Sequence, residues 1–239
     1  MSKWRLIAAP EMTGADNMAY DLKLFSDFEK MPGQPVLRIY SWRPKAISLG
    51  YAQKVDREID LEMAKALGWD VVVRPTGGGI VFHNEAEVTY SLVIGKDDPL
   101  LPKGLIPAYR KISTALIAGL AILGIKSEIS PSPSMMERGA ERRRGGVRGL
   151  CFNYPAEYEV VAAGKKIVGS AQKRGKTALL QQGSIFIRQT PPGDLSCLKA
   201  SVAEVNAVSV EDLLGREVSF NEVAAALESG FRKVFNSLF

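Results

Sequence analysis

Apolar residues recur along the chain at two spacings, one typical of strands and one typical of amphipathic helices. Short apolar or alternating runs predict strands at residues 4–9, 36–42, 46–51, 71–74, 80–82, 88–94, 158–162, 165–172 and 178–187. Helical spacing predicts helices at residues 14–30, 56–68, 105–123, 208–214 and 221–238. Thr13 is the expected N-cap of the first helix, and Gly164-Lys165 the expected turn of a late hairpin. This order of elements predicts an α/β (α+β) fold in which helices flank a large mixed β-sheet.

The pattern of apolar and polar residues shows no clear boundary between domains. We found no repeat and no clear linker before about residue 190, so we predict one domain over residues 1–239. The stretch from about 191 to 239 is expected to be a C-terminal helical extension packed on the main sheet. Regularity is lost at residues 130–149, which indicates a loop.

Composition narrows the class of protein. Hydrophobic residues make up 46% of the 239 residues and charged residues 24%, which is ordinary for a soluble globular protein. Because we see neither a run of about 18 apolar residues nor a signal-peptide core, we expect a cytoplasmic protein that does not bind membranes. The net charge of +5 suits an acidic protein partner. It would also suit nucleic acid, but no interleaved aromatic residues or binding motif accompany it. Two cysteines and one histidine form no recognisable metal pattern, so no metal is predicted.

Residues 74–83 carry three consecutive glycines, Gly77, Gly78 and Gly79, between two apolar runs. Glycine costs conformational entropy in β-rich sequence, and its missing Cβ lets the backbone approach a ligand closely. The stretch fits neither the Walker nor the dinucleotide pattern, and we predict no cofactor. Arg74 precedes the glycines and His83 follows them. We expect His83 to form a pocket wall or a structural hydrogen bond, and assign it no proton transfer because no acid partner is visible in the sequence.

Two side chains are candidates for chemistry. Cys151 follows an arginine-rich stretch, residues 137–148, and nearby positive charge would enlarge the thiolate fraction of its thiol. A thiolate attacks acyl donors and divides acyl transfer into two easier steps. Lys166 could polarise a carbonyl beside a glycine-lined pocket. From the residues alone, a buried structural Cys151 and a solvated Lys166 are the alternatives, because the glycine at 169 obscures which lysine of the strand points inward.

Several segments, in order, resemble the superfamily of lipoate–protein ligases, octanoyltransferases and biotin–protein ligases. The segments are Asn17 to Asp21, Ile47 to Gln53, Arg74 to His83, and Lys166 to Ala171. The resemblance covers most of residues 4–190 and implies a class II biotin/lipoyl-ligase-like catalytic domain. Gly149-Leu150-Cys151-Phe152, with Pro155 and Tyr158-Glu159, is similar to the octanoyltransferase branch of the LipM type, which uses a cysteine nucleophile. Gln182 departs from the pattern, since many relatives have a histidine there.

This resemblance implies an enzyme that moves an octanoyl group from acyl carrier protein to a lysine of a lipoyl-domain protein. Glycine cleavage H protein and 2-oxoacid dehydrogenase E2 are the implied acceptors, and the enzyme is expected to be a monomer. Cys151 would carry the acyl group and Lys166 would hold the carbonyl oxygen. Substrate binding is expected at Arg74, Gly77, Gly78, Gly79, His83, Gly169, Ser170 and Ala171.

Three other functions stay open. The first is an ATP-dependent lipoate or octanoate ligase, and the second is a lipoyl amidotransferase that works between lipoyl domains. The third is a non-catalytic protein that binds acyl groups or lipoyl domains.

Overall fold

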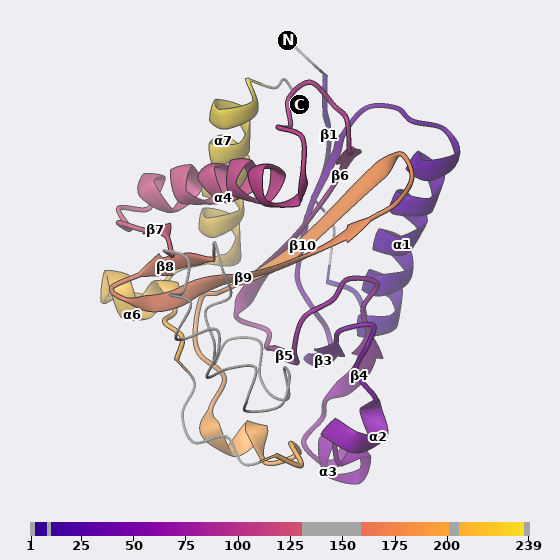
Figure 1. Cartoon of the computed structure of the whole chain (residues 1–239). Helices are drawn as coiled ribbons and strands as arrows, with labels where there is room; N and C mark the ends of the chain where they lie inside the picture. Colours follow the sequence, from indigo (N-terminus) through magenta and orange to yellow (C-terminus); the bar gives the residue numbers. More distant parts are fainter. Residues whose placement is uncertain (1–2, 9–10, 131–158, 201–205, 237–239) are drawn as a thin grey trace, which may run out of the picture.

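A seven-stranded sheet forms the centre of the protein, which the computed structural model describes for residues 3–8, 11–130, 159–200 and 206–236 (Figure 1). Its strand order is β1-β2-β6-β10-β9-β8-β7. Only β1 and β2 run parallel among these neighbours, so the sheet is mixed and the predicted fold class is confirmed. The strands are β1 (Arg5–Ala8), β2 (Val36–Tyr40), β6 (Glu87–Gly95), β7 (Glu128–Ile129), β8 (Val160–Ala162), β9 (Lys165–Arg174) and β10 (Ala178–Phe186).

Helices cover both faces of this sheet (Figure 1). Alternate residues of β6 point to opposite faces. Tyr90 and Leu92 enter the core beneath α4 (Leu105–Ile122) and α7 (Phe220–Phe235). Val93 packs on the other face with Phe25 of α1 (Gly14–Lys30). Thr13 caps α1 as predicted, since its side chain accepts a hydrogen bond from the Asp16 backbone N–H.

Two glycines allow α4 and α7 to cross closely. A Cβ on Gly230 of α7 would overlap the Ala115 carbonyl oxygen and the Gly119 backbone of α4. The short helix α6 (Val210–Leu214) precedes α7, and Phe231 of α7 lies in the same core as the main sheet. The division of the chain into domains stays a prediction.

By length and composition α4 is apolar enough to span a membrane. Its residues Ile112, Leu116 and Leu120 are instead buried in the core with the sheet and α7. Such burial is what a core helix of a globular protein requires.

A smaller sheet lies beside the large one, with the order β4-β3-β5. Strand β3 (Ala46–Leu49) pairs in parallel with β4 (Asp70–Val73) and antiparallel with β5 (Val81–His83). The apolar cluster on this sheet includes Ile59 and Cys197, both buried. The segment that joins β4 to β5 reaches the large sheet where the Thr76 hydroxyl donates to the Gln182 side-chain oxygen of β10 at 2.8 Å.

The predicted helix over residues 56–68 was wrong, because two short helices occupy the region. They are α2 (Val55–Glu58) and α3 (Leu61–Ala66). Between them Ile59 is extended, buried, and bridged to Leu198, while Asp60 caps α3 at the Met63 backbone N–H, 3.0 Å away. Tertiary contacts of Ile59 therefore interrupt the helix.

The late hairpin turn also lies one residue earlier than predicted. Ala163 and Gly164 have positive φ angles of 49° and 74°, and Lys165 already belongs to β9. A two-residue turn with two positive φ angles matches the twist of its strands. The single-turn 3-10 helix η1 (Pro192–Leu195) was not predicted.

Candidate functional site

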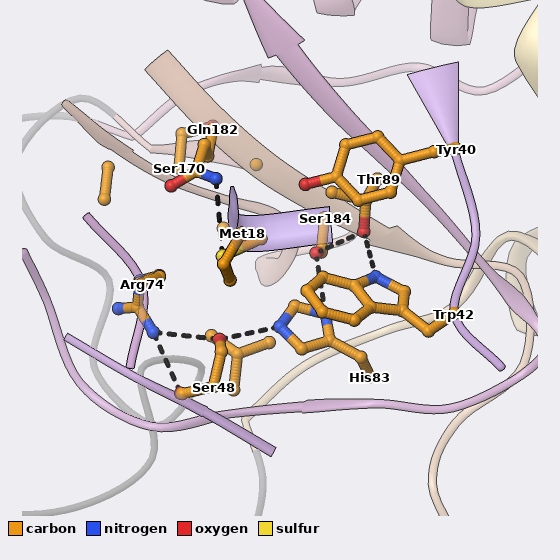
Figure 2. Close-up of a pocket in the computed structure, with 14 residues that line it drawn as sticks. Met18, Tyr40, Trp42, Ser48, Arg74, His83, Thr89, Ser170, Gln182 and Ser184 are labelled. Carbon is orange, nitrogen blue, oxygen red and sulfur yellow. Dashed lines mark hydrogen bonds between the residues drawn. The ribbon is translucent and has the colours of Figure 1, made fainter. Parts of the chain in front are cut away.

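A pocket opens between the two sheets and the N-terminal half of α1 (Figure 2). Its lining combines apolar side chains with hydroxyl, amide, imidazole and guanidinium groups. Its lining comprises Met18, Tyr40, Trp42, Ser48, Arg74, Val81, His83, Thr89, Gly169, Ser170, Ala171, Gln182, Gly183 and Ser184. Strands from both sheets thus contribute to one site.

Five of the predicted binding residues line this pocket: Arg74, His83, Gly169, Ser170 and Ala171. The three glycines at 77–79 lie behind Arg74, whose guanidinium donates to the Gly77 carbonyl (2.6 Å) and the Gly79 carbonyl (2.6 Å). Through these bonds the glycine turn positions the arginine, which occupies the pocket wall. The guanidinium also donates to the Ser48 carbonyl oxygen at 2.9 Å.

The glycine turn packs against a second turn that follows β3. A Cβ on Gly50 would overlap the Gly78 carbonyl oxygen and approach the Gly77 carbonyl carbon to 3.0 Å. A Cβ on Gly77 would meet only the Tyr51 ring, at 3.6 Å. The close approach therefore depends on Gly50, a position that sequence reasoning did not select.

His83 joins both sheets through its two ring nitrogens. Nε2 lies 2.7 Å from Ser48 Oγ of β3, and Nδ1 lies 2.8 Å from Glu87 Oε1 of β6. The imidazole stacks on the Trp42 indole, with ring centroids 4.0 Å apart and planes at 18°. Ser48, His83 and Glu87 are all buried. The expectation of a hydrogen-bonded wall residue is met, and Glu87 is the acid partner that the sequence did not reveal.

Strands β9 and β10 form the opposite wall. Ser170 Oγ lies 2.8 Å from the hydroxyl of Tyr90, which itself accepts a hydrogen bond from the Gln181 side-chain amide at 2.8 Å. Burial raises the pKa of Tyr90 to about 12. The phenol is therefore protonated near neutral pH and fixes the orientation of Ser170. Gly183 is cross-strand from Ser170, and a Cβ there would lie 2.6 Å from Ser170 Oγ.

A second polar network closes the pocket beside α1. Gln182 donates to Asp21 Oδ2 (2.7 Å) and accepts from Thr76 Oγ1 (2.8 Å). Asp21 also accepts from Tyr40 and forms an ion pair with Arg38, in which both side chains are fully buried. Burial, followed by the charge of Asp21, raises the pKa of Tyr40 well above its ordinary value. The amide at position 182 thus has two fixed partners where a histidine is expected in many relatives.

Lys166 does not line the pocket. Its side chain points inward from β9 and is buried, and Nζ lies 2.5 Å from Glu159 Oε1. Residues 169–171 of the same strand do line the pocket, and three residues of strand span about 10 Å. Cys151, Pro155 and the arginine-rich stretch 137–148 lie outside the described residues. Within the described residues, no cluster of three or more His, Cys, Asp or Glu side chains could hold a metal ion.

Comparisons with known proteins agree with this architecture. Residues 13–232 match the family described as lipoyl protein ligase A/B catalytic domain. Octanoyltransferase LipM of Clostridioides difficile is 35% identical over 246 residues, which cover 99% of this chain and 88% of the relative. LipM of Kyrpidia tusciae is 36% identical over 247 residues, covering 99% and 89%.

Solved structures show the same fold. Lipoate-protein ligase A bound with ATP superposes with a TM-score of 0.79 at 25% identity, covering 99% of this chain and 87% of that one. The T. acidophilum protein Ta0514 with bound lipoic acid gives 0.78 at 25% identity, covering 99% and 88%. With a family match over most of its length and relatives at this identity over nearly all of it, the chain belongs to the lipoyl protein ligase A/B catalytic domain family.

Proposed function

We propose that this protein is an octanoyltransferase of protein lipoylation, which moves an octanoyl group from acyl carrier protein to a lysine of a lipoyl domain. The observation that supports this most is the similarity, at 35–36% identity over nearly the whole chain, to proteins named octanoyltransferase LipM. Glycine cleavage H protein and 2-oxoacid dehydrogenase E2 are the proposed acceptors. We further propose that the protein acts as a monomer in the cytoplasm.

In this proposal the pocket takes the acyl chain. Apolar contacts come from Met18, Tyr40, Trp42 and Val81, with backbone from residues 169–171 opposite them. An eight-carbon chain offers about seven methylene and methyl groups, each worth roughly 0.8 kcal/mol when buried, or about 5–6 kcal/mol at most. The hydroxyl groups in the wall keep their hydrogen bonds to one another, so the chain would not leave them unpaired.

Chemistry would begin at Cys151. Its thiolate attacks the carbonyl carbon of the donor thioester, the carbon–sulfur bond to the carrier breaks, and the carrier leaves as a thiolate as the enzyme thioester forms. The neutral amine of the acceptor lysine then attacks this thioester, an amide forms, and the Cys151 thiolate departs. The proton that the amine loses passes to solvent, which protonates the carrier thiolate. Because an amide is more stable than a thioester, the reaction needs no ATP.

Lys166 is the proposed electrostatic partner of this step. The ammonium would hold the carbonyl oxygen while negative charge develops on it. Burial of an ammonium requires a counter-charge, and Glu159 supplies it at 2.5 Å. The lysine is therefore held on the strand that also forms the pocket wall.

The matched test compares the two cysteines of the chain. Cys197 is fully buried in the smaller core, and burial raises the pKa of its thiol, which makes it a poor nucleophile. Purified protein is incubated with octanoyl-acyl carrier protein and an apo lipoyl domain, without ATP, and intact masses are measured. We expect wild type and Cys197→Ala to carry octanoate on the peptide that contains Cys151 and to transfer it, and Cys151→Ala not to transfer it. Transfer at the wild-type rate by Cys151→Ala would refute the cysteine mechanism.

The structural likeness to lipoate-protein ligase A bound with ATP favours one second candidate, an ATP-dependent ligase. It is tested in the same experiment by adding free octanoate and ATP. Transfer that requires ATP and survives Cys151→Ala would favour the ligase over the transferase.

A further inference from the structure

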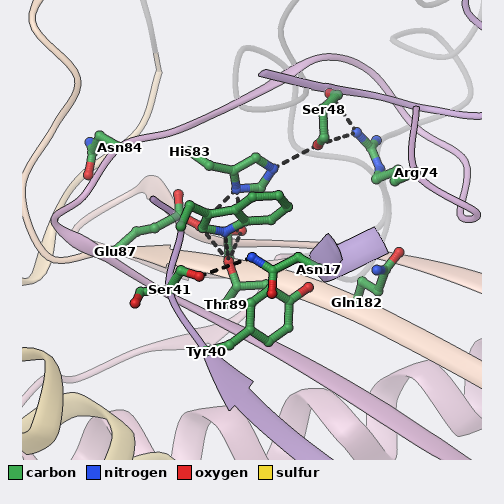
Figure 3. A network of polar contacts seen from close by, with 12 residues as sticks. Asn17, Tyr40, Ser41, Ser48, Arg74, His83, Asn84, Glu87, Thr89 and Gln182 are labelled. Atoms are coloured by element: carbon green, nitrogen blue, oxygen red, sulfur yellow. Dashed lines mark hydrogen bonds and ion pairs between the residues drawn. The ribbon is translucent and has the colours of Figure 1, made fainter. Parts of the chain in front are cut away.

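Two side chains of the pocket wall, Ser48 and His83, and the buried Glu87 behind them form one continuous hydrogen-bonded series (Figure 3). Ser48 Oγ lies 2.7 Å from His83 Nε2, and His83 Nδ1 lies 2.8 Å from Glu87 Oε1. The three residues come from β3, β5 and β6, so the series crosses from the smaller sheet to the larger one. A hydroxyl, an imidazole and a carboxylate within hydrogen-bond reach, in this order, are the parts of an activated nucleophile.

The hydrogen bonds assign a direction to the protons. Glu87 Oε1 also accepts from the hydroxyls of Thr89 (2.5 Å) and Ser184 (3.0 Å), so this carboxylate oxygen is surrounded by donors. In the neutral imidazole that fits this carboxylate, His83 donates through Nδ1–H and accepts through Nε2. Ser48 is left to donate its hydroxyl proton to Nε2, which is the arrangement that a general base requires.

The groups around Ser48, His83 and Glu87 stabilise the charges that proton transfer would create, negative on Ser48 Oγ and positive on the His83 ring. The Arg74 guanidinium lies 3.1 Å from Ser48 Oγ, where its positive charge stabilises negative charge on that oxygen. Glu87 is fully buried, and its Oε2 has no hydrogen-bond partner within the described residues. An undersolvated carboxylate stabilises a positive imidazolium beside it. Trp42 stacks on His83 and fixes the plane of the ring.

We propose that Ser48 is a second nucleophile of this pocket, activated by His83 and Glu87, and that it gives the protein a hydrolase activity toward acyl thioesters and activated acyl esters. Ser48 and His83 both line the pocket, as Figure 2 shows. This inference rests on the proposed function in one respect, namely that an acyl chain binds in this pocket.

Each step balances with water as the second substrate. Ser48 Oγ bonds to the acyl carbonyl carbon, its proton passes to His83 Nε2, and the thiol or alcohol leaves with that proton. Water then attacks the Ser48 ester and gives its proton to His83. The ester bond breaks, Ser48 recovers the proton, and the carboxylic acid is released.

The test uses the full-length Cys151→Ala protein, so that the other proposed nucleophile is absent, with p-nitrophenyl octanoate as the probe. We expect octanoate bound as an ester on the peptide that contains Ser48, together with release of p-nitrophenolate. Both signals should vanish when Ser48→Ala is added. Ser113→Ala, which removes a buried serine of α4 outside the pocket, is the control that should retain them.

Two further variants separate catalysis from misfolding. General-base assistance contributes about 10²–10⁴-fold, so His83→Asn in the same background should slow acylation of Ser48 by about a hundredfold or more. Glu87→Gln should slow it as well, while urea unfolding confirms that each variant is folded. An unmodified Ser48, or octanoate on a different residue, overturns the inference and leaves the proposed transferase intact. Transfer to the lipoyl domain by Cys151→Ala at the wild-type rate overturns the transferase mechanism instead.

Discussion

Replacing Gly183 by alanine tests how tightly the pocket wall is packed. The new Cβ would lie 2.5 Å from Tyr90 Cε1, 2.6 Å from Ser170 Oγ and 2.9 Å from the Gly169 carbonyl oxygen. Ordinary contact begins near 3.4 Å, so the Tyr90 ring would have to retreat by about 0.9 Å. That ring is fully buried and held by the Gln181 amide, while the Gly169 oxygen belongs to the paired backbone of β9.

The cost follows from these contacts. Overpacking of a buried site costs about 1–3 kcal/mol, and loss of the Tyr90–Ser170 hydrogen bond adds about 0.5–1.5 kcal/mol. Burial of one methyl group offsets about 0.8 kcal/mol. We expect a net loss of about 1–4 kcal/mol in the free energy of unfolding. In a chain of this size it lowers Tm by about 2–16 °C.

Urea unfolding followed by circular dichroism measures this loss. The control is Gly95→Ala at the end of β6, where an added Cβ would meet its nearest atom at 3.7 Å. This control should match or slightly exceed wild-type stability, since alanine reduces the entropy of the unfolded chain. A Gly183→Ala protein as stable as Gly95→Ala would show that Tyr90 and Ser170 yield at no cost, and the packing argument would fail.

Two more substitutions test other contacts. Gly50→Ala should lower the free energy of unfolding by about 1–3 kcal/mol, because its Cβ would overlap the Gly78 carbonyl oxygen. Gly77→Ala is the control: its Cβ has room, so the urea midpoint should stay unchanged or rise. Equal urea midpoints for the two variants would contradict this. Burial alone would raise the pKa of the Glu29 carboxyl, but backbone N–H groups of residues 176–178 outweigh it and hold the pKa below its usual 4.5. The carboxylate therefore stabilises the fold above pH 4.5, and the contribution is lost as pH falls through the lower pKa of the folded state. Glu29→Gln should be less stable than wild type near neutral pH and equal to it in strong acid, and a gap that does not change with pH would argue against this linkage.

Much of the architecture could be predicted from local pattern. Strand β6 is a long apolar run, α1 has an N-cap and an apolar stripe, and both lie within a residue or two of the expected positions. The helix over residues 56–68 could not be predicted correctly, because Ile59 is taken out of it by contacts with Cys197 and Leu198, far along the chain. Local propensity carries no information about such partners.

The site was predictable in part for the same reason. Arg74 and His83 stand out as a charged residue and a lone histidine beside consecutive glycines. The hydrogen-bond partners of His83 do not stand out in the sequence. Ser48 contacts His83 because β3 pairs with β5, and Glu87 contacts it because the chain turns between β5 and β6. The inward direction of Lys166 was likewise undecided from the sequence, because the glycine at 169 obscures the alternation of the strand. In the structure, β8 and β9 change register beside Lys166, and a bridge to Ala207 lies next to it.

The packing of α7 against α4 and the sheet affects how the chain folds during its synthesis. Phe231 and Phe235 of α7 cover apolar residues of strands that emerge from the ribosome much earlier, Tyr90 among them. Until residues 220–235 have been synthesised, that face of the nascent sheet has no helix α7 over it. Nascent chains with uncovered apolar faces aggregate or engage chaperones. Slowed translation shortly before this helix should therefore prolong chaperone association without altering the finished protein.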